Sequence, residues 1–315
     1  MHISKQGIII GLTLVGSIGS LLTFARLWQL KEWRLDRLRE HLRAEGFFRQ
    51  LFGIMRPAVI LLFILIALSG TPIDIITTIL LGALAAIASV QLALRMQPRP
   101  IWTAKAKILV FGTILLTTAI STFTLYRSAP ALLPAIVLLQ PAIFVFVWAV
   151  FLPIDKGSKC LIFREAMRLR SVLKEPTVIG ITGSAGKTTT KELLAHILEE
   201  KKPLTAPAHV NTEVGVAQWL IQKLGKEQQT PQILIIEMGA YHTGEIALLC
   251  NVVQPTIGIV TYIGSQHIGL FGSKEELCKA KGELIEALPE TGHAFLNVDN
   301  EHCDELAQRA ICPVS

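Results

Sequence analysis

Five long segments without a charged side chain dominate the first half of this sequence of 315 residues. None of them contains Asp, Glu, Lys or Arg, and they cover residues 6–25, 57–73, 75–94, 108–126 and 128–154. A helix needs about 20 apolar residues to cross the hydrocarbon core of a bilayer. We therefore predict a transmembrane domain over residues 1–155 with about five helices. Four helices are the alternative, because the segment 57–73 is short.

The charge of the chain is divided unevenly between its halves. Residues 1–155 hold 14 Lys/Arg against 6 Asp/Glu, whereas residues 156–315 hold 16 against 18. The basic residues of the first half gather in 26–56 and 95–107, and the other two connections are short and nearly neutral. Loops rich in Lys and Arg stay in the cytoplasm. This pattern predicts a multi-pass protein of the inner or plasma membrane with its N-terminus outside and everything after residue 155 in the cytoplasm.

The basic excess lies beside apolar segments, so it indicates the lipid bilayer as a partner and no nucleic acid. A cleaved signal peptide is the alternative for the first segment, but no small-residue cleavage pattern precedes the basic stretch. Residues 29–52 have the spacing of an amphipathic helix that lies on anionic headgroups. A solvated connector is the alternative for that stretch.

The second half has the sequence pattern of an α/β domain. A basic juxtamembrane linker over 156–175 is followed by short apolar runs at 177–182, 233–236 and 257–263, which we expect to be strands. Segments with helical spacing lie around them, at 189–200, 212–224, 243–250 and 274–288. Strands that alternate with helices favour a mostly parallel sheet covered on both faces. We expect this α/β P-loop domain to occupy residues 176–315.

The most specific motif is residues 182–189, with the sequence TGSAGKTT, between an expected strand and an expected helix. Such a loop wraps phosphates with backbone N–H groups, and the helix N-terminus adds positive potential. Lys187 is placed to reach the terminal phosphates, and the Thr188 hydroxyl is placed to bind Mg²⁺. The usual first glycine is absent, since Ile181 occupies its position. The loop predicts a nucleotide-binding site.

Two residues that follow expected strands are candidate metal ligands. Glu237 ends the apolar run 233–236, where a carboxylate that binds the magnesium ion of a P-loop belongs. The alternative is a glutamate that simply leaves a buried strand. His267 lies just after the run 257–263. Histidine is an uncommon ligand of Mg²⁺, so its residue type alone favours a surface role.

Further motifs follow the phosphate loop in a fixed order. They are NTEVGV (211–216), EMGA (237–240) with GEI (244–246), Gly264 with His267, FGS (271–273), AKGE (280–283) and LNVD (296–299). Together these blocks resemble the central, ATP-binding domain of the Mur ligase family. The resemblance covers about residues 176–315 and is closest to the UDP-N-acetylmuramoyl-tripeptide–D-alanyl-D-alanine ligase branch.

The resemblance implies ATP-dependent synthesis of an amide bond through an acyl phosphate, with ATP and Mg²⁺ as cofactors. The implied acceptor is a small-molecule or lipid-linked peptide substrate with a free carboxylate, and the implied donor is an amino acid or dipeptide. Peptidoglycan precursor synthesis by addition of D-alanyl-D-alanine is the favoured reaction. A ligase for another cell-surface polymer such as polyglutamate is the alternative, as is a non-catalytic nucleotide-binding membrane module.

The resemblance also implies roles for single residues. The implied catalytic residues are Lys187, Lys281 and His267. The implied magnesium ligands are Thr188, Glu237, His267 and Lys281, the last as a carbamate. The implied nucleotide contacts are Gly183, Ser184, Ala185, Gly186, Lys187, Thr188, Thr189 and Asn297. The implied substrate contacts are Asn211 and Thr212.

The sequence departs from the family pattern in two ways. A membrane domain stands where this branch normally carries a small domain for the uridine nucleotide of its substrate. The central domain also looks truncated at residue 315, and the C-terminal domain that closes on ATP does not follow. Because domain closure completes such sites, we expect this fragment alone to be inactive as a ligase.

Overall fold

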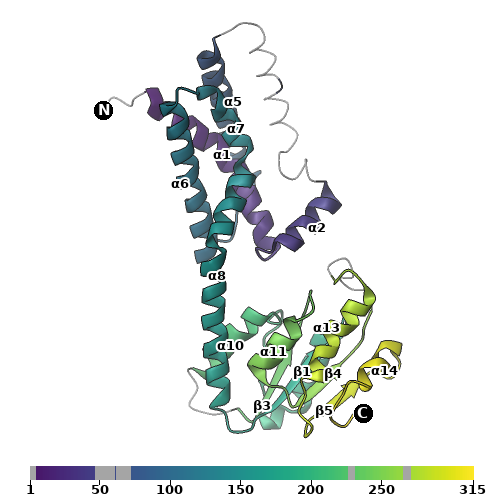
Figure 1. Cartoon of the computed structure of the whole chain (residues 1–315). Coiled ribbons are helices and arrows are strands. Elements are labelled where there is room, and N and C mark those ends of the chain that lie inside the picture. The colour runs from purple at the N-terminus through teal and green to yellow at the C-terminus, as the bar shows by residue number, and fades with distance from the viewer. Residues whose placement is uncertain (1–4, 47–60, 62–71, 226–230, 265–270) are drawn as a thin grey trace. The chain divides into compact units, whose positions relative to one another are not determined.

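The computed structural model describes residues 5–46, 61, 72–225, 231–264 and 271–315. Contacts within the chain divide it into two compact units, residues 1–153 and 154–315. Unit 1 is helical, and unit 2 contains a β-sheet (Figure 1). The boundary between the units falls at Pro153, inside the long helix α8 (Gln140–Ser171). The predicted linker is therefore helical as far as Ser171.

Unit 1 consists of long apolar helices and short connecting ones. In the described residues its elements are α1 (Lys5–Leu30), α2 (Leu35–Glu45), α5 (Ile73–Ala93), α6 (Ala104–Tyr126), η1 (Pro130–Leu132), α7 (Leu133–Leu138) and the first part of α8. Among these, α1, α5, α6 and α8 are long and apolar enough to cross a membrane. The other predicted span, residues 57–73, lies almost entirely outside the described residues. The prediction of an apolar, helical first half is thus confirmed, with four helices in the described residues that are long enough to cross a membrane.

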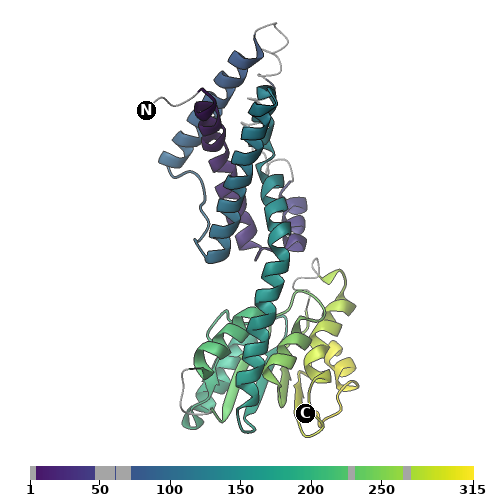
Figure 2. The same ribbon diagram turned by 60° about the vertical axis from the view of Figure 1, so that its left-hand side comes forward.

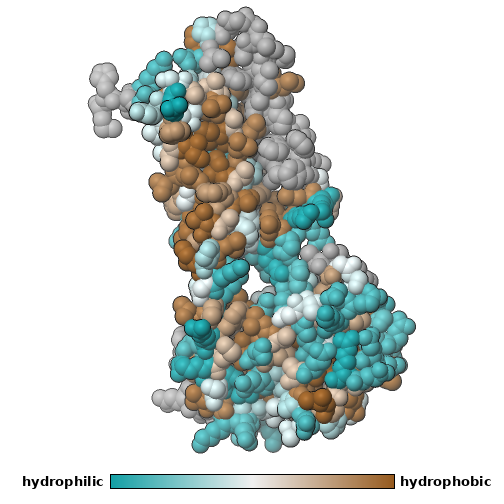
Figure 3. All heavy atoms as spheres, viewed as in Figure 1, coloured by the Kyte–Doolittle hydropathy of each residue, from teal (hydrophilic) through white to brown (hydrophobic). Residues whose placement is uncertain are grey.

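Small side chains allow the helices of unit 1 to approach closely. α1 runs beside α5 and α6 (Figures 1 and 2). A Cβ atom added to Gly16 of α1 would lie 3.3 Å from the Cβ of Leu84 on α5, so a larger residue would push the helices apart. Contacts of this kind stabilise helix pairs in membranes, where apolar burial gives no driving force between helices. On the face of unit 1 seen in Figure 3, hydrophobic residues predominate.

The described part of the basic segment 26–56 and the basic segment 95–107 meet at one end of unit 1. The Gln29 side chain donates to the carbonyl of Ile101 at 2.8 Å and accepts from the Ile101 N–H at 2.7 Å. This pair joins the C-terminal end of α1 to the basic segment 95–107. The prediction that both basic segments face the cytoplasm requires such a common end; the orientation itself stays a prediction.

The expected amphipathic helix over residues 29–52 is broken. α1 continues to Leu30, and the chain turns at Glu32 and Trp33, whose φ angles are 55° and 61°. α2 begins only at Leu35 and ends at Glu45. Positive φ values interrupt a right-handed helix, so a single helix over this stretch was wrong. Residues 47–52 lie outside the described residues.

The sheet of unit 2 is parallel throughout its described part. Its strands are β1 (Thr177–Thr182), β2 (Leu204–Thr205), β3 (Ile233–Glu237), β4 (Ile257–Val260) and β5 (His293–Leu296), in the order β2-β3-β1-β4-β5. β1 lies between β3 and β4, with Ile181 opposite Glu237 and Thr182 opposite Val260. The carboxyl ends of these strands therefore meet at one edge, where ligands bind in open α/β sheets.

Helices cover both faces of the sheet, as the sequence predicts. They are α9 (Lys187–Ile197), η2 (Glu199–Lys201), α10 (Glu213–Leu224), α11 (Glu245–Val253), α13 (Lys274–Glu286) and α14 (Glu301–Ala307). On one face, Ile179 and Ile181 pack with Leu194 of α9. On the other, Val178 and Leu234 belong to the core formed with α10, α11 and α13. This two-sided burial explains why the strands read as continuous apolar runs.

Candidate nucleotide and metal site

The phosphate loop joins the end of β1 to the start of α9. β1 ends at Thr182, and α9 begins at Lys187. Gly183 and Gly186 have backbone φ angles of 146° and 82°. Residues that carry a Cβ atom rarely adopt such angles. A Cβ on Gly183 would also lie 2.1 Å from the Oγ1 atom of Thr261. The two glycines are therefore required for the chain to turn from the strand into the helix.

The loop is held against the end of β4. The Ser184 N–H donates to the carbonyl of Tyr262 at 2.6 Å, and the Thr261 hydroxyl donates to the carbonyl of Ala185 at 2.6 Å. The Ser184 hydroxyl accepts from the N–H of Gly264 at 3.1 Å. These bonds fix the loop, so that the N–H groups at the start of α9 have a defined direction. Sequence reasoning did not assign Thr261, because the apolar run 257–263 that predicted a strand includes it, whereas β4 ends at Val260.

Glu237 brings three elements together at the carboxyl edge of the sheet. It ends β3, is 3% exposed, and lies opposite Ile181 of β1. Its Oε2 atom accepts from the Thr188 hydroxyl at 2.9 Å, and its Oε1 atom accepts from the Asn211 amide at 3.0 Å. The predicted metal ligands Thr188 and Glu237 are therefore in direct contact. The predicted substrate residue Asn211 shares the same carboxylate.

Lys187 is folded back onto its own loop. Its Nζ atom donates to the carbonyl of Gly183 at 2.7 Å. Partial burial lowers the pKa of Lys187, and the negative charge of Glu237 opposes this shift. The side chain is cationic and has a flexible stem, so it can exchange the loop carbonyl for a stronger acceptor such as a phosphate oxygen.

Lys281 of α13 is a buried cation at the same site. It is 3% exposed, and within the described residues its ammonium forms no hydrogen bond or ion pair. Burial, together with the positive charge of Lys187, lowers the pKa of Lys281 to about 8, although the negative charges of Glu245 and Glu283 oppose the shift. A buried cation without a partner is costly. Such an amine loses its proton more easily than an exposed lysine does.

The neighbouring carboxylates are engaged elsewhere. Glu283 accepts from the N–H groups of Gly244 and Ala247, the latter at 2.9 Å, at the start of α11. Glu245 accepts from the Tyr241 N–H at 2.7 Å. Both carboxylates therefore satisfy backbone donors and do not pair with Lys281.

A cavity of about 130 Å³ lies between these groups. It is lined by Gly183, Ser184, Lys187, Asn211, Glu237, Gly239, Ala240, Tyr241, Phe271, Leu277 and Lys281. Six of the predicted site residues line it: Gly183, Ser184, Lys187, Asn211, Glu237 and Lys281. Tyr241, Phe271 and Leu277 were not assigned to the site, because their place in it depends on how α13 and the loop after β3 pack.

The remaining predicted residues lie around the cavity. Thr212 caps α10 by accepting from the N–H of Gly215 at 3.3 Å. The Asn297 amide donates to the carbonyl of Thr261 at 2.8 Å, so it braces the end of β4. Thr189, Ala185 and Gly186 are exposed on the phosphate loop and the start of α9. Their ligand contacts, like those of Thr212 and Asn297, stay predictions. His267 lies outside the described residues.

The residues present fit a magnesium ion. Mg²⁺ in nucleotide sites is held by one or two carboxylates together with phosphate oxygens and water. Thr188 and Glu237 supply a hydroxyl and a carboxylate in contact beside the phosphate loop. No group of three or more His, Cys, Asp or Glu gathers anywhere in the described ranges. The described residues therefore form no site that would surround a metal ion with protein ligands alone. The Thr188 hydroxyl and the Glu237 carboxylate suit a magnesium ion that is also bound by nucleotide phosphates.

Comparison with known proteins decides the family of this domain. A family model described as the Mur ligase middle domain matches residues 181–314. Residues 181–314 are a Mur ligase middle domain. The family consists of ATP-dependent carbon–nitrogen ligases. The resemblance inferred from the sequence motifs is confirmed over this part of the chain.

Several relatives of the Mur ligase middle domain share one description, UDP-N-acetylmuramoyl-tripeptide--D-alanyl-D-alanine ligase. The protein from Synechocystis sp. is 42% identical over 133 residues, which cover 42% of this chain and 28% of that protein. The Mycobacterium tuberculosis protein is 41% identical over 133 residues, which cover 42% and 25%. The Escherichia coli protein is 37% identical over 126 residues, which cover 39% and 26%. The chain thus spans about a quarter of the length of these relatives.

Solved structures that resemble part of this chain were also found. MurF from Acinetobacter baumannii has 29% sequence identity and a TM-score of 0.46, over 50% of this chain and 34% of that one. MurF ligase from Thermotoga maritima in complex with ADP has 30% identity and a TM-score of 0.45, over 50% and 36%.

Proposed function

We propose that this chain belongs to a membrane-attached, ATP-dependent amide ligase whose middle domain binds Mg-ATP at the phosphate loop. The observation that carries the proposal is the convergence of Lys187, the pair Thr188–Glu237 and Lys281 on one small cavity. The proposed reaction transfers the γ-phosphoryl group of ATP to a substrate carboxylate. An amine then displaces phosphate from the acyl phosphate and forms the amide.

Each group has a role that its chemistry supports. The backbone of residues 183–189 cradles the phosphates, and Lys187 leaves the Gly183 carbonyl to pair with a phosphate oxygen. Thr188 and Glu237 hold Mg²⁺, which when bound neutralises charge on the phosphoryl oxygens. Asn211 positions Glu237 through the bond to its second carboxylate oxygen. His267 is proposed as a further magnesium ligand on the strength of the family motif alone.

Lys281 is proposed to act as a carbamate. The ammonium first loses one proton to water. The neutral amine then attacks CO₂, a C–N bond forms as one C=O π bond opens to an oxyanion, and the nitrogen loses a second proton, so a cation becomes an anion. The low pKa of Lys281 supports this step, because the free amine is the reactive form and is already present near pH 8. The anion would hold a second magnesium ion in the cavity and would remove the repulsion between Lys281 and Lys187.

The substrate pair is proposed from the relatives. A peptidoglycan precursor with a free carboxylate is the proposed acceptor, and D-alanyl-D-alanine is the proposed donor, at the cytoplasmic face of the plasma membrane. One observation favours a second candidate, a ligase for another cell-surface polymer such as polyglutamate. The described residues before the Mur ligase domain form mostly long apolar helices, in the place where the family resemblance implies a small domain for the uridine nucleotide.

The test is release of ADP by detergent-solubilised protein with each proposed substrate present or absent. Because we expect the 315-residue chain to be inactive alone, it is compared with the same chain joined to the C-terminal domain of a Mur ligase relative. Uridine-linked muropeptide with D-alanyl-D-alanine is compared with a polyglutamyl acceptor and glutamate. Release by the joined form that needs muropeptide and dipeptide together supports the first candidate, and release with the polyglutamyl pair supports the second. ATP binding by the joined form without turnover under any condition would contradict the ligase.

A further inference from the structure

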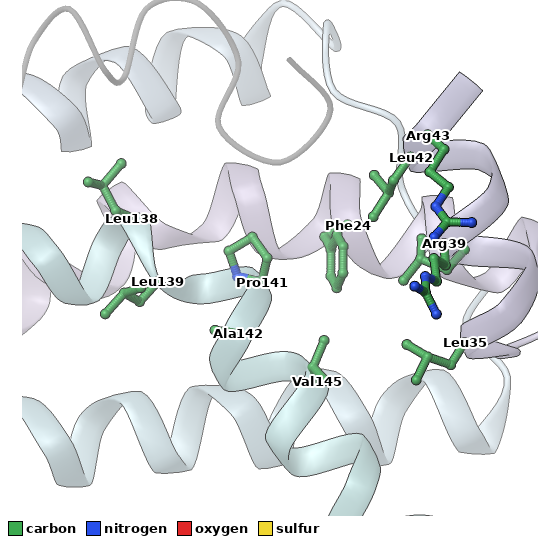
Figure 4. Close-up of a pocket in the computed structure, with 11 residues that line it drawn as sticks. Phe24, Leu35, Arg39, Leu42, Arg43, Leu138, Leu139, Pro141, Ala142 and Val145 are labelled. Carbon is green, nitrogen blue, oxygen red and sulfur yellow. The ribbon is translucent and has the colours of Figure 1, made fainter. Parts of the chain in front are cut away.

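Unit 1 contains a large apolar groove that the proposed ligase reaction does not use. Its volume is about 700 Å³, within the range of about 300–1,000 Å³ that is usual for small-molecule sites. It is lined by Phe24, Leu35, Leu38, Arg39, Leu42, Arg43, Leu138, Leu139, Pro141, Ala142 and Val145. Figure 4 shows Arg39 and Arg43 at one end of this apolar groove and Leu138 and Leu139 at the other.

The break between α1 and α2 creates the cationic end of the apolar groove. After the turn at Glu32 and Trp33, α2 packs Leu38 and Leu42 into the aromatic core of unit 1, where they are 2% and 8% exposed. Arg39 and Arg43 each follow one of these leucines and are one helical turn apart. Residues four apart lie on the same face of a helix, so both guanidinium groups border the same opening.

Among the described residues the two arginines have no partner, unlike Arg34 and Arg37 of the same region. Within the described residues neither Arg39 nor Arg43 forms an ion pair or hydrogen bond, and both are exposed. By contrast, Arg34 pairs with Asp36 at 3.4 Å, and the buried Arg37 pairs with Glu32 at 2.7 Å. Glu32 and Asp36, the acidic side chains beside this turn, therefore pair with arginines that do not line the apolar groove.

The apolar groove has one cationic end and one apolar end, as the binding site of an amphiphile would. Its arginines lie just past the C-terminal end of α1, beside the end of unit 1 where Gln29 meets Ile101. Its other end is formed by Leu138 and by residues at the start of α8, one of the helices able to cross a membrane. Charge at the membrane surface and apolar side chains below it match a lipid with an anionic headgroup.

We propose that the apolar groove binds one anionic phospholipid of the surrounding bilayer. The phosphate pairs with Arg39 and Arg43, and one acyl chain lies between Phe24 and Val145 toward Leu139. The bound lipid fixes α2 at the surface of the cytoplasmic leaflet. This inference rests on the proposed membrane location and not on the ligase reaction.

The test measures lipid retained by the purified full chain in native mass spectrometry. Protein is loaded from vesicles of phosphatidylcholine with or without phosphatidylglycerol. The variant Arg39→Gln with Arg43→Gln removes the cationic end, and Ala142→Trp fills the apolar part. Arg95→Gln with Arg99→Gln is the matched control, since it removes two exposed positive charges of unit 1 outside the apolar groove.

The wild type should retain phosphatidylglycerol in preference to phosphatidylcholine. The Arg39/Arg43 double variant should lose that preference by about tenfold or more, because both cationic partners of the lipid phosphate are removed. The Arg95/Arg99 variant should keep it, and Ala142→Trp should retain less of both lipids. Equal loss in the control, or unchanged retention in Ala142→Trp, would overturn the apolar groove as the binding site.

A separate extraction distinguishes failure of the membrane location from failure of the groove. If alkaline carbonate releases the chain from membranes, the membrane location is wrong and the lipid site falls with it. If the chain stays in the membrane and retains no phosphatidylglycerol selectively, the membrane location stands and the lipid site is wrong.

Discussion

Lys187 and Lys281 are two lysines of one cavity that differ in their surroundings. Lys187 has an acceptor in the carbonyl of Gly183 and lies near the charge of Glu237. Lys281 is buried and faces the positive charge of Lys187. A lysine with an acceptor keeps its proton, and a buried one beside another cation gives it up more easily. Residue type alone therefore does not predict which lysine loses its proton more easily; the burial and the neighbouring charges of each lysine do.

The pKa of Lys281 leads to a pH prediction. Because its folded-state pKa is lowered from 10.5 to about 8, the ammonium predominates below that pH and the neutral amine above it. Carbamate formation needs the neutral amine, so the extent of modification should rise with pH at constant CO₂, most steeply below about pH 8, where the ammonium predominates. A ¹³C-carbamate NMR signal after incubation with labelled bicarbonate measures it.

Lys281→Ala should abolish that signal, whereas Lys279→Ala on the exposed side of the same helix should keep it. The predicted carbamate would be wrong if the wild type gave no signal at alkaline pH. It would also be wrong if the signal persisted in Lys281→Ala.

At the scale of elements, the loop between β1 and α9 has little freedom to change. Gly183→Ala should prevent Mg-ATP binding and lower the free energy of unfolding of unit 2 by about 1–3 kcal/mol, because it combines an unfavourable φ with a clash. The new Cβ would lie 2.1 Å from the Thr261 hydroxyl oxygen. Thermal unfolding and ATP titration measure the two effects.

Gly157→Ala is the matched control, because Gly157 lies in α8 with no atom within 4 Å of an added Cβ. It should leave ATP binding unchanged and stabilise the helix slightly. If Gly183→Ala behaved like this control, the strained turn would not be needed for the site.

Long apolar elements were predictable from the sequence, and short or edge elements were not. β1, β3 and β4 lie where the apolar runs place them, because central strands of a parallel sheet are buried on both faces. β2 has two residues, and β5 reads HAFL with an exposed Phe295, so neither has such a run. The turn at Glu32 and Trp33 was also missed, since nothing in these residue types demands positive φ.

The candidate site could be predicted in its local parts. Thr188 and Glu237 are in contact because the phosphate loop starts at the end of β1 and Glu237 ends the neighbouring strand β3. The burial of Lys281 beside Lys187 depends on the packing of α13 against the sheet, and no spacing in the sequence fixes that. The brace from Thr261 to the loop is likewise a tertiary contact.

At the scale of the whole molecule, the predicted topology places residues after 155 in the cytoplasm. Cys160 is exposed, and the other four cysteines, all in unit 2, are buried. An impermeant thiol reagent should therefore label Cys160 in inside-out vesicles and not in intact cells. Ser128→Cys, at an exposed position predicted outside, should add labelling in intact cells. The reverse pattern would mean the opposite orientation.

The central claim is that the middle domain binds Mg-ATP through Lys187, and an ATP titration of the purified 315-residue chain tests it most directly. The wild type should bind Mg-ATP, and Lys187→Ala should weaken binding at least about tenfold, because a charged hydrogen bond to phosphate is lost. Lys201→Ala, an exposed lysine of η2, should bind like the wild type. Equal affinity of Lys187→Ala and the wild type for Mg-ATP would contradict the account.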